Sequence, residues 1–112
     1  LTIHLIMVKL MILFKKPPTN EVESFENVFS QSYVPAINKV PNLKRATVTR
    51  TIGAPRGEAA YYLVHELYFE DFATLTQSLN TQQGREAGER LMGFARDLIT
   101  LMYAEMWEEA LA

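Results

Sequence analysis

Glu66 is the side chain whose surroundings best suit acid–base chemistry. It lies in the segment AYYLVHELYF (60–69), which is largely apolar or aromatic on both faces and predicts a strand. Successive residues of a strand point to opposite faces, so Glu66 shares a face with Tyr62 and Tyr68. Apolar neighbours should raise the pKa of this carboxyl group, which could then act as a general base or hydrogen-bond a ligand.

Two alternatives for these side chains stay open. Glu66 could instead form a structural ion pair with Arg50 or Lys9 on an adjoining strand, because ion-pair networks also perturb carboxylates. Tyr33 stands at the end of the predicted first helix and could point over the edge of the sheet toward the same cavity as Glu66. It could equally be a packing tyrosine that buries its ring and keeps a wet hydroxyl group.

Metal and cofactor chemistry find no support in the sequence. The chain has two histidines, His4 and His65, and no cysteine. Because His65 and Glu66 are neighbours on a strand, their side chains leave opposite faces and cannot chelate one metal together. We expect no metal site and a hydrogen-bonded core or interface role for His65. GxSxG, GxGxxG and P-loop motifs do not occur, so we also expect no cofactor.

The composition indicates one small globular domain. The chain has 112 residues, of which 48% are hydrophobic and 21% charged, with a formal net charge of -2. This balance gives no bulk attraction for anionic lipid, and the apolar run 1–14 is too short for a membrane helix. The absence of cysteine favours a reducing compartment. We therefore expect a cytoplasmic protein with no membrane partner.

A basic segment between Lys39 and Gly57 contains no acidic residue. On the kind of sheet expected here, such charges raise the possibility of an RNA-binding module, whose central strands present stacking aromatics. The basic-Gly-aromatic opening of that motif is missing, and the first strand has no aromatic residue in its middle. A solvated edge strand explains the charges, and we expect no nucleic-acid partner.

The predicted elements run strand, helix, strand, strand, helix, strand. We expect strands over 8–14, 44–52, 60–69 and 100–107, and helical segments over 20–34, 71–80 and 81–98. Pro35 should end the first helix. One sheet with its helices on a single face gives an α+β, ferredoxin-like βαββαβ sandwich. We expect residues 1–6 to be an N-terminal extension, 7–109 the domain and 110–112 a tail.

The sheet face that the helices leave open should be polar, yet both faces of the predicted strands are apolar. Such a face marks an interface or a ligand cavity. Two sheets stacked face to face would close a barrel, so we expect a homodimer and a small apolar organic ligand. The candidate ligand-binding residues are Tyr62, Tyr68, Met11, Met102 and Met106.

Several short motifs, in their order along the chain, resemble the EthD (ethyl tert-butyl ether degradation) family. They are MVKLMILFKKPP (7–18), Phe25, YVPAI (33–37), PNL (41–43), HELYF (65–69), the segment 81–84 and Phe94. The resemblance covers about residues 7–109. It implies a dimeric α+β barrel that binds a small molecule, with an oxidoreductase role like that of monooxygenases in the superfamily, or an accessory role in catabolism.

The resemblance also implies roles for individual residues. Family members usually show Ala-Glu-Leu-Trp-Phe in the third strand, which places Glu66 and Tyr68 toward the cavity. Tyr33 stands where the family has a cavity histidine, and Arg90 where it has an aspartate. Glu66 and Tyr33 are thus the catalytic candidates. Because the histidine and aspartate are both replaced, the alternative is a non-catalytic dimer that binds and delivers a ligand.

Overall fold

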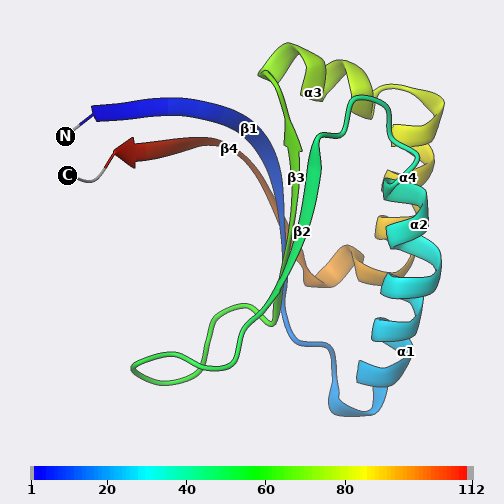
Figure 1. Ribbon diagram of the computed structural model, residues 1–112. Coiled ribbons are helices and arrows are strands. Elements are labelled where there is room, and N and C mark those ends of the chain that lie inside the picture. The colour runs from blue at the N-terminus through cyan, green and yellow to red at the C-terminus, as the bar shows by residue number, and fades with distance from the viewer. Residues whose placement is uncertain (1, 111–112) are drawn as a thin grey trace.

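The computed structural model describes residues 2–110, whose strands form a four-stranded antiparallel sheet in the order β2-β3-β1-β4 (Figure 1). The strands are β1 (Thr2–Phe14), β2 (Arg45–Arg50), β3 (Leu63–Phe69) and β4 (Ile99–Ala110). The helical segments cover one face of the sheet and leave the other open. This arrangement confirms the predicted α+β, ferredoxin-like βαββαβ sandwich. Residue 1 and most of the predicted tail (111–112) lie outside the described residues.

Two helical runs form the covering layer. The first joins η1 (Thr19–Glu21), α1 (Val22–Val28), η2 (Phe29–Tyr33) and α2 (Val34–Ile37), and the second contains α3 (Phe72–Leu79), α4 (Gln82–Ala95) and η3 (Arg96–Leu98). Side chains cap the second run: Asp71 accepts a hydrogen bond at the start of α3, and Thr81 at the start of α4. Within residues 2–110, no helix has the length and apolar character needed to cross a membrane.

The first helical run continues past Pro35, where the sequence predicted its end. Proline lacks the N–H that would bond four residues back, and its ring pushes against the carbonyl there. η2 is a π-helical turn, in which the N–H of Val34 donates to the carbonyl of Phe29, five residues back. The wider turn accommodates the proline ring, so the run reaches Ile37.

The strand register decides which side chains meet the helices. Leu10 of β1 pairs with Leu67 of β3 and Tyr103 of β4, and these three residues face the helical layer. Because side chains alternate along a strand, the next set of paired residues lies on the open face. That set is Met11, Glu66 and Met102.

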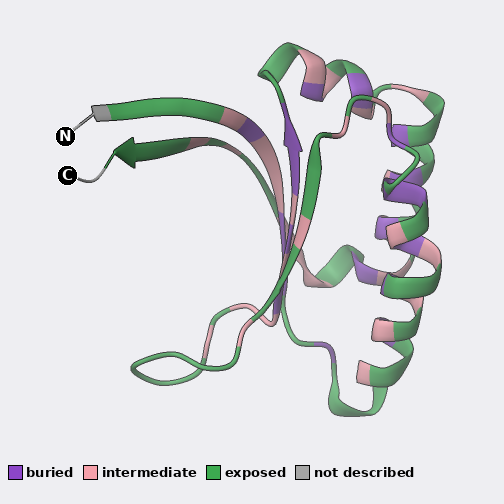
Figure 2. Cartoon of the chain, viewed as in Figure 1, coloured by how far each residue is buried: buried purple, intermediate pink, exposed green. Residues whose placement is uncertain are grey.

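The core lies where the helices meet the sheet (Figure 2). At the end of β1, Phe14 is fully buried, and its ring packs edge-on against Phe25 and Phe29 with centroid separations of 5.6 and 5.7 Å. Phe94 of α4 stacks on Phe14 at 6.4 Å, and Tyr33 packs against Phe94 at 5.8 Å. These five residues, here called the Phe14 cluster, attach both helical runs to the same end of the sheet.

β1 and β4 extend beyond the helical layer as a two-stranded arm (Figure 1). Leu5 lies opposite Trp107 in this arm, both are exposed, and the register shifts between Leu5 and Met7. Residues 2–6, which we expected to be an extension, thus continue β1 in the structure. The domain limits of 7–109 stay a prediction.

Gly84, in the first turn of α4, permits close contact with the end of α3, because a Cβ atom there would collide with the backbone of Leu79. We expect Gly84→Ala to lower the free energy of unfolding by about 1–3 kcal/mol in urea titrations, since packed backbone must move apart. Gly93→Ala is the matched control, because a Cβ there meets nothing within 4 Å. It should raise stability by up to about 1 kcal/mol, since alanine is the better helix former. Equal changes in the two variants would contradict the close contact.

Candidate functional site

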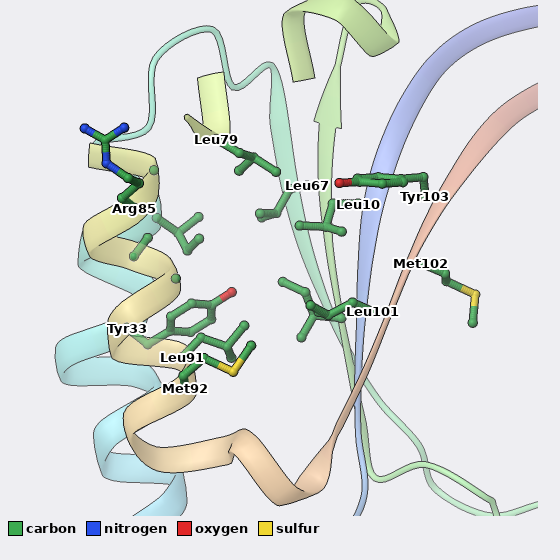
Figure 3. A pocket seen from close by; sticks show the side chains of 15 residues that line it. Leu10, Tyr33, Leu67, Leu79, Arg85, Leu91, Met92, Leu101, Met102 and Tyr103 are labelled. Atoms are coloured by element: carbon green, nitrogen blue, oxygen red, sulfur yellow. The ribbon is translucent and has the colours of Figure 1, made fainter. Parts of the chain in front are cut away.

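A cavity of about 360 Å³ lies between α4 and the helix-facing side of the sheet (Figure 3). This volume falls in the range of small-molecule sites. Its wall is mostly aliphatic or aromatic. The lining residues come from β1 (Leu10, Ile12), β3 (Leu67), β4 (Leu101, Met102, Tyr103), the first helical run (Tyr33, Ile37), α3 (Leu79) and α4 (Gly84, Arg85, Ala87, Gly88, Leu91, Met92).

Two small residues of α4, Ala87 and Gly88, leave this space unfilled. Gly84, Ala87, Gly88 and Leu91 follow the helical repeat of three and four residues, so they lie on one side of α4 and line the cavity. A Cβ atom on Gly88 would meet nothing within 4 Å. α4 is held against the sheet at one end, but its small residues do not fill the space between the rest of the helix and the sheet.

Tyr33 lines the cavity, and its phenol contacts the imidazole of His65, which is not itself a lining residue. Tyr33 and His65 are 0% and 1% exposed, and Tyr33 Oη lies 3.2 Å from His65 Nδ1. Burial lowers the pKa of His65 to about 4, so its imidazole is neutral at physiological pH. Burial also raises the pKa of Tyr33, which keeps the phenol protonated. The prediction of a hydrogen-bonded core histidine is confirmed.

The rim of the cavity carries the more exposed polar groups. Tyr103 of β4 is 58% exposed, and its ring packs edge-on against Phe72 of α3 at a centroid separation of 5.0 Å. Arg85 borders the cavity, but its guanidinium points away from it in Figure 3. Arg85 Nη1 donates a hydrogen bond to the carbonyl of Asn80 at 2.5 Å.

Glu66 lies on the open face of the sheet, across from the cavity. Lys9 Nζ lies 2.5 Å from Glu66 Oε2, and Tyr68 Oη donates to the same oxygen at 2.8 Å. Burial acts to raise the pKa of Glu66, but the hydrogen bonds and charge from Lys9, Tyr68 and Arg45 outweigh it and lower the pKa. The expected raised pKa is therefore wrong. The structural ion pair with Lys9, the alternative considered above, is the arrangement observed.

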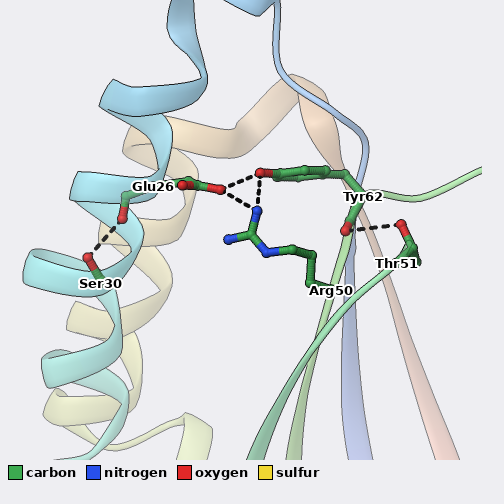
Figure 4. A network of polar contacts seen from close by, with 5 residues as sticks. All are labelled: Glu26, Ser30, Arg50, Thr51 and Tyr62. Atoms are coloured by element: carbon green, nitrogen blue, oxygen red, sulfur yellow. Dashed lines mark hydrogen bonds and ion pairs between the residues drawn. The ribbon is translucent and has the colours of Figure 1, made fainter. Parts of the chain in front are cut away.

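The alternation of side chains predicted that Tyr62 shares a face with Glu66 and Tyr68. This prediction is wrong. Tyr62 precedes β3, so the strand does not set its direction, and its ring packs edge-on against Phe25 at 6.4 Å. Its hydroxyl group donates to Glu26, and Arg50 Nη1 donates to Glu26 Oε1 at 2.6 Å (Figure 4). This network joins α1 to the edge of the sheet, and Glu26, Arg50 and Tyr62 are not among the residues that line the cavity.

The remaining site candidates divide between the two faces of the sheet. Met11, Met102 and Met106 lie on the open face, whereas Tyr33 lies at the cavity. Met102 borders the cavity through its place on β4, but its side chain points away from the helices (Figure 3). Their contacts with a ligand stay a prediction.

The sequence reasoning missed the small residues of α4 and the link between Tyr33 and His65. One signal for the second was present. His65 alternates with Leu63, Leu67 and Phe69, the more apolar set of the strand, and all four are buried under the helices. Among the described residues, no three histidine, aspartate or glutamate side chains gather as a metal site requires.

Comparison with known proteins gives a relative that is similar in both sequence and fold. An ethyl tert-butyl ether degradation (EthD) family protein from Bacillus halodurans is 36% identical, covers 90% of this chain and 99% of its own, and superposes with a TM-score of 0.84. An uncharacterized 11.0 kDa protein from the thcB-thcC intergenic region of Rhodococcus erythropolis is 22% identical over 99 residues, 88% of this chain and 94% of that protein.

A dimeric ferredoxin-like protein of unknown function from Jannaschia sp. is similar in fold. It is 13% identical, with a TM-score of 0.64 over 89% of this chain and 99% of its own. No protein-family model matches the chain.

The Lys9–Glu66 pair generates a pH prediction. The pKa of Glu66 in the folded chain lies below its ordinary value of 4.5, so the pair adds stability above that pH and loses it as the pH falls through the folded pKa. At neutral pH, we expect Glu66→Gln to lower the free energy of unfolding by about 1–3 kcal/mol, because Lys9 keeps its charge without a charged partner. The difference from wild type should shrink below pH 4.5.

The measurement is urea unfolding at several pH values and one fixed protein concentration. Glu86→Gln is the control, because Glu86 and Arg90 form an exposed pair on α4 at 2.9 Å. That variant should change stability by at most about 0.5 kcal/mol. A loss in Glu66→Gln that is the same at acid and neutral pH would contradict the account of the pair.

Proposed function

The chain belongs to the ethyl tert-butyl ether degradation (EthD) family, and on that basis we propose that it binds a small apolar organic molecule in the cavity between α4 and the sheet. The observation that carries this proposal is the cavity itself. A volume of about 360 Å³ exceeds what a packed core leaves empty, and its wall is mostly apolar. Transfer of a hydrocarbon body from water into such a space gains about 0.8 kcal/mol for each buried methylene group.

Binding and delivery of the ligand is the role this geometry supports best. The carboxylate of Glu66 lies across the sheet from the cavity and is paired with Lys9, so it does not reach a ligand held there. An accessory role of this kind in catabolism needs a pocket and no catalytic carboxylate in it.

An oxidoreductase role, like that of monooxygenases in the superfamily, is the second candidate. The hydrogen-bonded pair of Tyr33 and His65 favours it, because phenol and imidazole groups serve as proton donors and acceptors toward a bound ligand. Prolonged incubation of a bound ligand with oxygen separates the two roles. Recovery of unchanged ligand supports delivery, and a stoichiometric oxidised product supports oxidoreductase activity.

We also propose that two copies of the chain associate through the open faces of their sheets. Met102 and Met11 present apolar surface there, and Met102 is 43% exposed in the single chain. Apolar surface of this kind on a sheet marks an interface. The ferredoxin-like relative from Jannaschia sp. is described as dimeric, which agrees with this arrangement.

Gly88→Leu tests the cavity. A leucine at this position adds side-chain volume where a Cβ now meets nothing within 4 Å, so the affinity for a neutral apolar probe should fall at least about tenfold. Binding is followed by the fluorescence of N-phenylnaphthylamine. Stability should not fall, because leucine is a better helix former than glycine.

Gly93→Leu is the matched control, since Gly93 lies on α4 with free space around it but does not line the cavity. It should bind the probe as wild type does. Equal binding by wild type and both variants would place the probe elsewhere and overturn the proposed function.

Met102→Lys tests the association of the open faces. Sedimentation velocity should give twice the 12.8 kDa chain mass for wild type and the single-chain mass for this variant, because association would bury the lysine charge in an apolar interface. Ile52→Lys, at a fully exposed position, should stay dimeric. A wild-type protein that sediments as one chain, or a Met102→Lys dimer as tight as wild type, would refute this interface.

A further inference from the structure

The inner wall of the cavity presents one buried polar side-chain atom among the described lining residues, Tyr33 Oη. The other polar lining groups are placed differently. Tyr103 lies at the exposed rim, and the guanidinium of Arg85 turns outward to the carbonyl of Asn80. A ligand that fills the inner part of the cavity therefore meets aliphatic groups and one phenol oxygen (Figure 3).

Tyr33 Oη has hydrogen-bonding capacity beyond its contact with His65. A phenol has one donor and two acceptor sites, and within residues 2–110 His65 Nδ1 is the partner that lies within hydrogen-bonding distance, at 3.2 Å. The hydroxyl group points toward the space between α4 and Leu101 in Figure 3. At least one of its sites therefore has no partner among the described residues. Because Tyr33 is 0% exposed, a ligand reaches Oη once neighbouring side chains of the cavity wall move aside.

The tautomer of His65 decides whether Tyr33 Oη donates or accepts the hydrogen bond to a ligand. When the neutral imidazole donates its Nδ1 proton to Tyr33 Oη, the phenol proton is left for a carbonyl or ether oxygen of the ligand. When Nδ1 accepts the phenol proton instead, Oη accepts a hydrogen bond from a hydroxyl group of the ligand. His65 acts through Tyr33 and is a positioning residue.

We infer that the cavity selects neutral, apolar molecules that carry one hydrogen-bonding oxygen, such as ketones, ethers or alcohols, and that this oxygen binds at Tyr33 Oη. The inference rests on the proposed function and names its ligand class. Tyr33 and His65 are both neutral, so a charged ligand group would lose its hydration at the inner wall without gaining a counter-charge. A plain hydrocarbon would leave the Tyr33 hydroxyl group without its second partner.

The test compares two ligands of nearly the same shape, the ketone α-tetralone and the hydrocarbon tetralin. Displacement of N-phenylnaphthylamine measures the affinity of each for the full chain. Wild type should bind α-tetralone about threefold to tenfold more tightly than tetralin, after correction for their different solubilities in water, as one additional hydrogen bond provides. Tyr33→Phe keeps the ring and removes the hydroxyl group, so it should bind the two ligands equally.

Tyr103→Phe is the matched control, because it removes the other phenol that lines the cavity. It should keep the preference for the ketone. The inference is wrong if wild type binds the two ligands with equal corrected affinity, or if Tyr33→Phe keeps the preference. If neither ligand displaces the probe from wild type, the proposed function itself fails.

A spectrum of the imidazole nitrogens tests the positioning role of His65. The chain has two histidines, and His4, in the arm formed by β1 and β4, is an internal control. In long-range proton–nitrogen NMR correlations, α-tetralone should shift the nitrogen resonances of His65 and leave those of His4 unchanged. Tyr33→Phe should abolish the shift. A His65 signal that does not respond in wild type would contradict the link through Tyr33.

Discussion

The contacts of the Phe14 cluster at one end of the sheet are the constraint on which the rest of the structure depends. Phe25 and Phe29 from the first helical run and Phe94 from α4 meet the ring of Phe14, so both runs are held to the sheet at the same place. Farther along α4, glycine and alanine face the sheet. The large side chains of the Phe14 cluster set the distance between the helices and the sheet. The small residues of α4 do not fill the space at that distance, and this space is the cavity.

The two faces of the sheet have separate chemistry. The helix-facing side holds the cavity and a neutral pair, Tyr33 and His65. The open side holds an ion pair, Lys9 and Glu66, with Tyr68 beside it and methionines around it. The two pairs are linked through β3, because His65 and Glu66 are consecutive residues of that strand and point to opposite faces. The proposed ligand site and the proposed interface between two copies therefore lie on opposite faces of one sheet.

Local patterns predicted the element order and the shared face of Glu66 and Tyr68, because these depend on residues close in sequence. The patterns did not decide which face the helices cover, since both faces of β3 are apolar. They misplaced Tyr62 because it lies one residue before the strand begins. The lowered pKa of Glu66 depends on Lys9, which is distant in the chain, and the passage through Pro35 depends on a π-helical turn that no local signal marks.

The most direct measurement of the central claim, that the ligand site lies between α4 and the sheet, is a crystal structure of the full chain grown with α-tetralone. The account predicts one molecule of α-tetralone in the cavity, its ring among Leu67, Leu91 and Leu101 and its oxygen within hydrogen-bonding distance of Tyr33 Oη. Density for the ketone on the open face of the sheet, beside Glu66 and Tyr68, with the cavity filled by rearranged side chains, would contradict it.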